Sequence, residues 1–223
     1  MELLTYADAE LMMIEVASRL AGQLRQALSS GERASLAVPG GTTPGPIFDS
    51  LCAADLDWAR VSVMLTDERW VPEDSPRSNT RLLRQRLLTG RAAAAAHVPL
   101  VTADPTPEEG IPALSEAIAA RLPLSVCLLG MGADMHTASI FPGADRLSEA
   151  LTTDAILVPM RAPGAPEPRV TLSARVLKGA IARHVVITGA AKREAIERAR
   201  GLSPEEAPVA AILKGSIVHW AES

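Results

Sequence analysis

The chain has 223 residues, of which 48% are hydrophobic and 22% are charged, and these are ordinary proportions for a globular protein. Its formal net charge of −4 gives no overall attraction toward nucleic acid or an anionic membrane, so neither partner is expected. No apolar run is long enough to cross a membrane and no signal peptide is apparent, which predicts a cytoplasmic protein. An anionic ligand would therefore need a local cluster of Arg and Lys.

The predicted elements alternate between helices and strands along the chain. Asp8 is expected to cap a first helix, with Leu11 and Ile14 on its inward apolar face, and Gly31 is expected to end it. Further helices are expected near 47–51 and over 79–88, 107–122 and 190–200. Strands are expected at 34–38, 61–65, 97–101, 125–129, 156–160, 170–172, 184–188 and 209–213.

Most of the expected strands are apolar on both faces, which is typical of a mainly parallel sheet covered by helices on both sides. The sequence has no internal repeat, and the Pro-rich stretch 163–168 is too short for a domain linker. We therefore predict an α/β fold in which residues 1–223 form a single domain.

Polar loops follow three of these strands, at 39–44 (PGGTTP), 66–70 (TDERW) and 130–139 (GMGADMHTAS). Ligands of open α/β sheets bind beyond the carboxyl ends of the strands. In the first loop, Gly40 and Gly41 allow the backbone to approach a ligand, and Thr42 and Thr43 add hydroxyl groups. This composition suits a phosphate or polyol cradle, although an ordinary structural turn is the alternative.

The third loop concentrates acid–base chemistry, because it holds Asp134 and His136 two residues apart. In an extended backbone both side chains would point the same way, so Asp134 could orient His136 or strengthen it as a base. The alternative is that Asp134 only caps the following turn. The other histidines, His97, His184 and His219, are expected at edges or on the surface.

Several classes of protein are disfavoured by what the motifs lack. GMGADM has Met135 in place of the third glycine of a dinucleotide-binding fingerprint, and neither a GxxxxGK[ST] loop nor a GxSxG elbow around Ser139 is present. The histidines have no metal-ligand spacing, and Cys52 and Cys127 are expected to be buried reduced thiols. No metal or cofactor is therefore expected.

The motifs, in this order, resemble the 6-phosphogluconolactonase family, whose pattern runs GGSTP, DER with a downstream SN, GxGxDGHTASLFP, RxT and GxxK. Here they stand as Gly40–Pro44, Asp67–Arg69 with Ser78-Asn79, Gly130–Pro142, Arg169–Thr171 and Gly189–Lys192. The resemblance covers almost the whole chain. It implies a three-layer, Rossmann-like α/β fold and hydrolysis of 6-phospho-D-glucono-1,5-lactone, a small sugar-phosphate lactone. We expect a monomer or weak dimer.

The resemblance also implies roles for individual residues. His136 matches the family's general base, and the ordinary pKa of an imidazole, about 6.5, suits proton transfer at neutral pH. Arg69 could stabilise the oxyanion or bind a substrate oxygen, and Asp67 could bind a sugar hydroxyl or hold Arg69. Arg169 and Lys192 match the phosphate-binding positions.

Two alternatives stay open at this stage. A glucosamine-6-phosphate deaminase or related isomerase would carry a further carboxylate soon after the histidine, whereas this chain continues with 137–142 (TASIFP). A non-catalytic sugar-phosphate sensor would be expected to lose His136 or Arg69, and both remain. Met135 departs from the family's glycine: the residue either keeps the glycine's positive φ at a cost in strain, or has an ordinary φ with its side chain packed beside residues such as Ile140 and Phe141. We expect the second arrangement.

Overall fold

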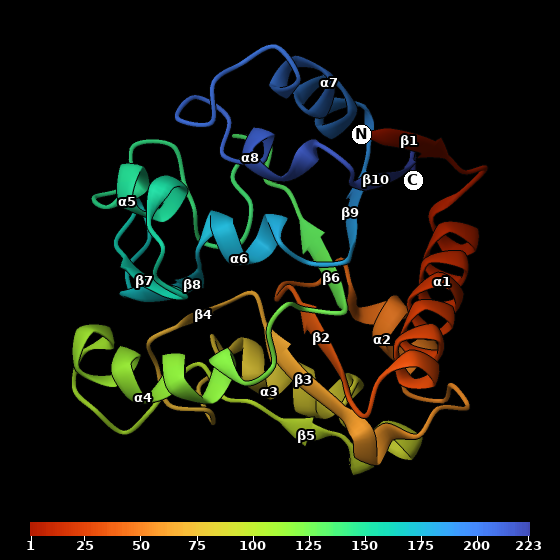
Figure 1. Ribbon diagram of the computed structural model, residues 1–223. Coiled ribbons are helices and arrows are strands. Elements are labelled where there is room, and N and C mark those ends of the chain that lie inside the picture. Colours follow the sequence, from red (N-terminus) through yellow and green to blue (C-terminus); the bar gives the residue numbers. More distant parts are fainter.

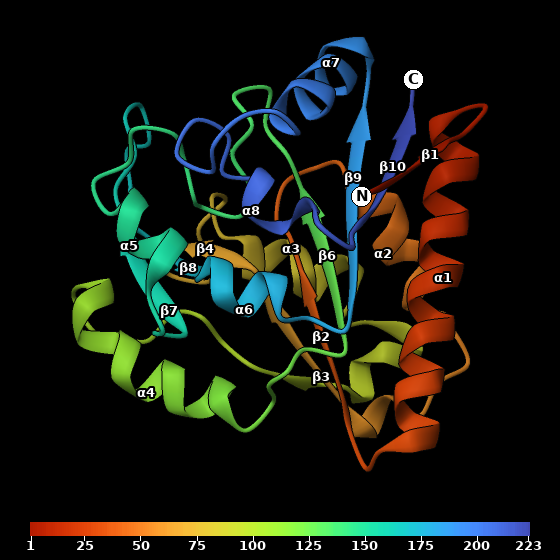
Figure 2. The same cartoon turned by 45° about the horizontal axis from the view of Figure 1, so that its top comes forward.

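The computed structural model describes residues 1–223 and is built around a seven-stranded sheet in which every neighbouring pair is parallel (Figures 1 and 2). From edge to edge the strands are β1 (Glu2–Thr5), β10 (Ile217–Ala221), β9 (Ala182–Thr188), β6 (Val126–Gly130), β2 (Ala34–Val38), β3 (Val61–Leu65) and β5 (Ala96–His97).

Helices flank this sheet on both sides, which confirms the predicted three-layer α/β fold. In Figures 1 and 2, α1 (Ala9–Ser30) and α2 (Gly45–Leu51) lie on one side, and α6 (Ala174–Lys178) and α8 (Ala210–Leu213) lie on the other. The remaining helices are α3 (Asn79–Arg86), α4 (Pro107–Ala119), α5 (Leu147–Thr152) and α7 (Ala190–Ala199), with short 3₁₀ turns η1 (Trp58–Arg60) and η2 (Gly90–Ala94).

A second, three-stranded antiparallel sheet was not expected from the sequence. It consists of β4 (Asp67–Arg69), β8 (Arg169–Leu172) and β7 (Leu157–Met160). The segment 67–69, predicted as a loop, leaves β3 and pairs at once with β8, so that Arg69 lies opposite Arg169. The small sheet thereby brings polar residues from distant parts of the chain to the edge of the main sheet.

Both ends of α1 lie where the sequence predicts them. The Asp8 carboxylate accepts a hydrogen bond from the backbone N–H of Leu11 at 2.8 Å, as expected of an N-cap, and Gly31 caps the end of α1. Leu11 and Ile14 are nevertheless exposed, because the first half of α1 turns Met12, Met13 and Val16 toward the core instead. None of the helices is both long and apolar enough to span a membrane.

The last predicted strand, 209–213, is wrong: Ala210–Leu213 is the short helix α8, and the strand comes later, at β10. A short apolar run cannot be distinguished from a buried helical turn by periodicity alone. The N-terminal strand β1, which pairs with β10, was also missed. The predicted strand 97–101 is reduced to Ala96–His97, since Pro99 has no N–H to donate to a ladder.

One continuous cluster of 59 buried apolar residues includes side chains from both sheets. Cys127 lies in this cluster, and its complete burial raises the pKa of its thiol to about 12. Cys52 is also a free thiol but is only partly buried, in contrast to our expectation. Aliphatic side chains and methionine make up most of this core.

The expectation that His184 and His219 lie at edges or on the surface is wrong, because both side chains are fully buried. They form a chain of hydrogen bonds from Tyr6 Oη to His219 Nδ1 (2.8 Å), from His219 Nε2 to His184 Nδ1 (2.9 Å) and from His184 Nε2 to Gln23 Oε1 (2.8 Å). We call these four residues the edge network. Burial lowers the pKa of His184 to about 4 and of His219 to about 3.

Candidate active site

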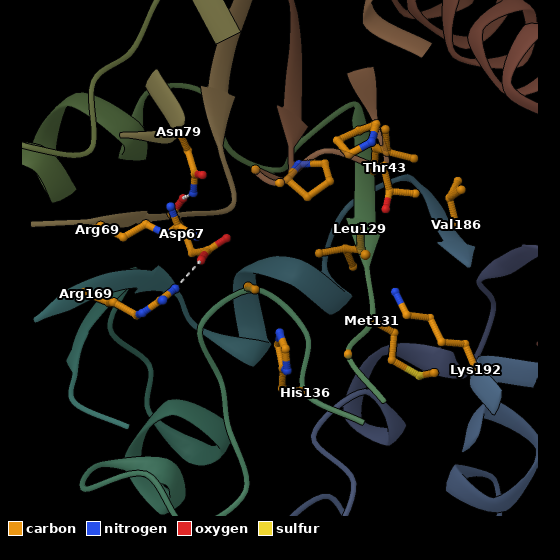
Figure 3. A pocket seen from close by; sticks show the side chains of 18 residues that line it. Thr43, Asp67, Arg69, Asn79, Leu129, Met131, His136, Arg169, Val186 and Lys192 are labelled. Atoms are coloured by element: carbon orange, nitrogen blue, oxygen red, sulfur yellow. Dashed lines mark hydrogen bonds and ion pairs between the residues drawn. The ribbon is translucent and has the colours of Figure 1, made fainter. Parts of the chain in front are cut away.

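A pocket of about 230 Å³ opens at the carboxyl ends of the central strands, between the main sheet and the small sheet (Figure 3). Ligand sites of open α/β sheets are found at this edge. Eight of the ten predicted site residues line the pocket: Gly40, Gly41, Thr43, Asp67, Arg69, His136, Arg169 and Lys192. Of the other two, Thr42 is exposed to solvent, and Asp134 contacts His136 from outside the lining.

His136 stands on the loop after β6, and Asp134 bonds to one edge of its ring. Asp134 Oδ1 lies 2.6 Å from His136 Nδ1 and also accepts a hydrogen bond from the His136 backbone N–H at 3.1 Å. Asp134 therefore makes both contacts considered from the sequence, one to the ring of His136 and one to the backbone of the turn. Since Nδ1 donates to this carboxylate, Nε2 is the nitrogen left without a proton in the neutral ring.

Glycine is required beside this imidazole. A Cβ atom at position 132 would lie 2.3 Å from His136 Cε1 and Nδ1, a separation that real side chains do not reach. Gly132 therefore lets the backbone press against the edge of the ring. The second glycine of the GxG pattern serves the histidine, and no nucleotide-binding role is needed to explain it.

The structure differs from our expectation for the backbone of Met135 but agrees that its side chain is buried. Its φ is 67°, so the left-handed backbone of the family's glycine is kept and the expectation of an ordinary φ is wrong. The side chain is nevertheless buried in the core, as expected. Hydrogen bonds hold the strained residue, because Met135 N–H donates to Gly132 O (2.9 Å) and Val209 N–H donates to Met135 O (3.1 Å).

A buried polar cluster forms one wall of the pocket, and we call Asp67, Ser139 and Arg169 the pocket cluster. Ser139 Oγ donates to Asp67 Oδ2 at 2.5 Å, while Arg169 Nη1 lies 3.9 Å from the same carboxylate oxygen and 3.4 Å from Ser139 Oγ. Desolvation lowers the pKa of Arg169, an effect that Asp67 opposes. The contact of Ser139 was missed by sequence reasoning, and its only signal was a hydroxyl within the polar loop.

Arg69 does not pair with Asp67, one of the two arrangements considered from the sequence. Its Nη1 donates to the backbone carbonyl of Arg77. The Nε atoms of Arg69 and Arg169 are both buried and have no hydrogen-bond partner. Unpartnered buried donors are costly, and two of the four unpartnered buried side-chain atoms belong to these pocket arginines, while the other two, His97 Nε2 and Arg121 Nε, lie away from the pocket.

Glu68 is a site-building residue that sequence reasoning also missed. Its buried carboxylate accepts hydrogen bonds from the backbone N–H groups of Arg69, Asn79 and Thr80 and from the hydroxyls of Ser78 and Thr80. These bonds hold the start of α3 against β4 and bring Asn79 to the pocket.

Gly40 is required beside this arrangement. A Cβ atom at position 40 would meet Asn79 Cγ at 2.0 Å, so only glycine fits there. The close approach of the backbone expected at Gly40 is thus observed toward the Asn79 side chain.

Lys192 reaches the pocket from the first turn of α7, which begins after Gly189 at φ 85°. Figure 3 shows Lys192 on one side of the pocket, Arg169 and Arg69 on the other, and His136 between them. The site therefore combines a histidine with cations on both sides, and this arrangement suits an anionic ligand.

This arrangement defines a class of protein, namely an α/β enzyme that combines an acid–base histidine with cations suited to a phosphorylated small molecule. The chain belongs to the family of glucosamine-6-phosphate isomerases/6-phosphogluconolactonase, whose model matches residues 7–220.

Individual relatives indicate which of the family's two activities this chain resembles. The chain is 42% identical to the 6-phosphogluconolactonase of Rhizobium meliloti, over 96% of this chain and 94% of that protein. It is 37% identical to the 6-phosphogluconolactonase of Pseudomonas aeruginosa, over 92% and 88%. These relatives confirm the prediction of an enzyme of the 6-phosphogluconolactonase type.

Solved structures agree with the sequence relatives. A crystal structure of a 6-phosphogluconolactonase from Shewanella baltica superposes with a TM-score of 0.95 at 33% identity, covering 99% of this chain and 97% of that one. A monomeric glucosamine-6-phosphate deaminase superposes with a TM-score of 0.82 at 16% identity, and this likeness concerns the fold alone.

Proposed function

We propose that the protein hydrolyses 6-phospho-D-glucono-1,5-lactone to 6-phospho-D-gluconate, the second step of the oxidative pentose phosphate pathway. The observation that carries the proposal is the setting of His136, whose Nδ1 is bonded to Asp134 while the ring lines a pocket flanked by cations. A δ-lactone is an activated ester, so a positioned base and a donor for the oxyanion are sufficient chemistry.

In the proposed mechanism, His136 Nε2 takes a proton from a water molecule as its oxygen attacks the lactone carbonyl carbon. The carbonyl oxygen becomes an oxyanion, and Arg69 stabilises it, since a permanently charged guanidinium with an unpartnered Nε suits a developing negative charge. When the intermediate collapses, the bond to the ring oxygen breaks, and the protonated His136 returns its proton to that oxygen. The product is the open-chain acid, and the enzyme is regenerated.

The phosphate of the substrate lies in the proposal between Arg169 and Lys192, with the Gly40–Thr43 loop as a third wall. Arg169 and Lys192 supply the local positive charge that the acidic chain lacks overall. Asp67 has two uses compatible with its contacts: it holds Arg169 through Ser139, and it can accept a hydrogen bond from a sugar hydroxyl. Asp134 keeps the imidazole in the tautomer that the mechanism needs.

The test compares two reactions of the purified protein. Freshly generated 6-phosphogluconolactone should be hydrolysed far faster than in a protein-free control, which corrects for spontaneous hydrolysis, while glucosamine 6-phosphate should release no ammonia. Ammonia release without lactone hydrolysis would replace the proposal by a deaminase. Tight binding of 6-phosphogluconate with turnover of neither compound would replace it by a sugar-phosphate sensor.

A further inference from the structure

Phe141 contacts both halves of the site, although the mechanism assigns it no role. Its ring centroid lies 4.2 Å from that of His136, with the two planes inclined by 33°. The guanidinium carbon of Arg169 lies 5.3 Å from the centroid of the same ring. Phe141 does not line the pocket, so any effect on the reaction must pass through the two residues that it touches.

A tight, buried turn places Phe141 there. The Ile140 N–H donates to Thr137 O at 3.0 Å, and Ala138 between them has a φ of 49°. The turn is anchored because Thr137 Oγ1 donates to Gly130 O at 2.9 Å and Ser139 bonds to Asp67. Since Thr137, Ser139 and Ile140 are fully buried, the turn has little freedom, and it returns the chain so that residue 141 meets residue 136.

Asp134 and Gly132 contact the edge of the His136 ring, and Phe141 adds an aromatic contact. Asp134 bonds to Nδ1 and Gly132 lies beside Cε1 and Nδ1, so both act near one edge of the ring. A single hydrogen bond at one edge leaves the plane of the ring free to tilt. The Phe141 ring is the aromatic contact on His136, and tilted aromatic pairs at this separation are attractive.

We propose that Phe141 is a positioning residue that sets the plane of His136 and its separation from Arg169. The proposal rests on the proposed function: with the substrate phosphate near Arg169, the shared aromatic ring holds His136 Nε2 at the distance that the lactone carbonyl requires. The Arg169 guanidinium, which has few polar partners, gains a cation–π contact from the same ring. One side chain thereby joins the binding and the reacting ends of the site.

The test replaces each of the two phenylalanines of the chain by leucine, so that Phe48→Leu is the matched control for Phe141→Leu. Phe141→Leu should lower kcat about tenfold and raise KM by no more than about threefold, since misorientation of a base mainly affects the chemical step. Phe141→Tyr, which keeps the ring, should stay within about threefold of wild type. The control Phe48→Leu, in the buried core of α2, should lower Tm and leave kcat unchanged.

An independent readout follows the His136 ring itself. In the wild type, the ring current of Phe141 should displace the Cε1–H or Cδ2–H proton resonance of His136, identified by its loss in His136→Ala, and Phe141→Leu should abolish the displacement. If Phe141→Leu fails to fold, Phe141→Met takes its place.

An unchanged kcat, or a lowered kcat with an unchanged His136 resonance, would overturn the positioning role. A wild type that does not hydrolyse the lactone would instead refute the proposed function, and the spectra would still report the contact between the two rings.

Discussion

The pocket cluster and the edge network are both buried groups of polar side chains, yet they differ in how completely their hydrogen bonds are made. In the edge network both nitrogens of His184 and His219 have partners. Beside the pocket, the Nε atoms of Arg69 and Arg169 have none. The edge network thus satisfies its buried histidines within the fold, whereas the two guanidinium groups that line the pocket keep polar capacity that the fold does not use.

The histidines show the same contrast. His184 and His219 are fully buried without a carboxylate partner, and burial favours their neutral forms. The side chain of His136 is 30% exposed and is bonded to Asp134. We therefore expect substitutions at the pocket to change activity and substitutions in the edge network to change stability.

The largest effect is expected from His136→Ala. Removal of a general base lowers kcat by roughly two to four orders of magnitude, and KM and Tm should change little because the side chain is partly exposed. Steady-state lactone hydrolysis, corrected for the spontaneous reaction, measures the effect. A variant within a few-fold of wild type would remove His136 from the mechanism.

Acidification should act on the edge network. An unfolded histidine binds its proton near pH 6.5, whereas folded His184 does so only near pH 4, so the unfolded state binds more protons between these values. The stabilising effect is therefore complete above about pH 6.5 and lost as the pH falls toward 4, a loss on the order of 3 kcal/mol for His184.

Urea unfolding between pH 4 and 7 measures this loss. His184→Gln should make the dependence on pH shallower. The same slope in wild type and His184→Gln would show that other groups control acid stability.

Loss of the pocket cations should mainly weaken binding. Arg169→Ala and Lys192→Ala should each raise KM by roughly 10- to 100-fold, the effect of about 1.5–3 kcal/mol for a charged hydrogen bond, with a smaller change in kcat. Lys178→Ala, an exposed cation outside the pocket, is the control and should leave KM unchanged. Equal turnover of phosphorylated and unphosphorylated gluconolactone by the wild type would contradict phosphate recognition.

The smallest effect is expected at Met135, where strain and burial oppose each other. Met135→Gly relieves about 1 kcal/mol of left-handed strain but removes a buried side chain worth about 2 kcal/mol or more, so a net loss of about 1–2 kcal/mol is expected. Met135→Ala keeps the strain and loses most of the packing, so it should be less stable than Met135→Gly. Thermal melts decide, and a glycine variant more stable than wild type would show that strain dominates.

The sequence alone determined most of the elements and the residues of the site. Apolar runs marked β2 and β3 with correct bounds, Asp8 marked the start of α1, and the motifs placed eight of ten predicted residues on one pocket. These features are local: a buried strand, a cap and a polar loop each need only a few neighbouring residues to be recognised.

Only the tertiary structure decided which side chains meet. The contact between Asp67 and Ser139 joins residues 72 positions apart, and the burial of His219 depends on its pairing between β1 and β9. Met135, at a φ of 67°, likewise accepts a hydrogen bond from the distant Val209. Such contacts arise from the packing of whole layers, which determines burial, partners and backbone strain together, and no window of the sequence contains both partners.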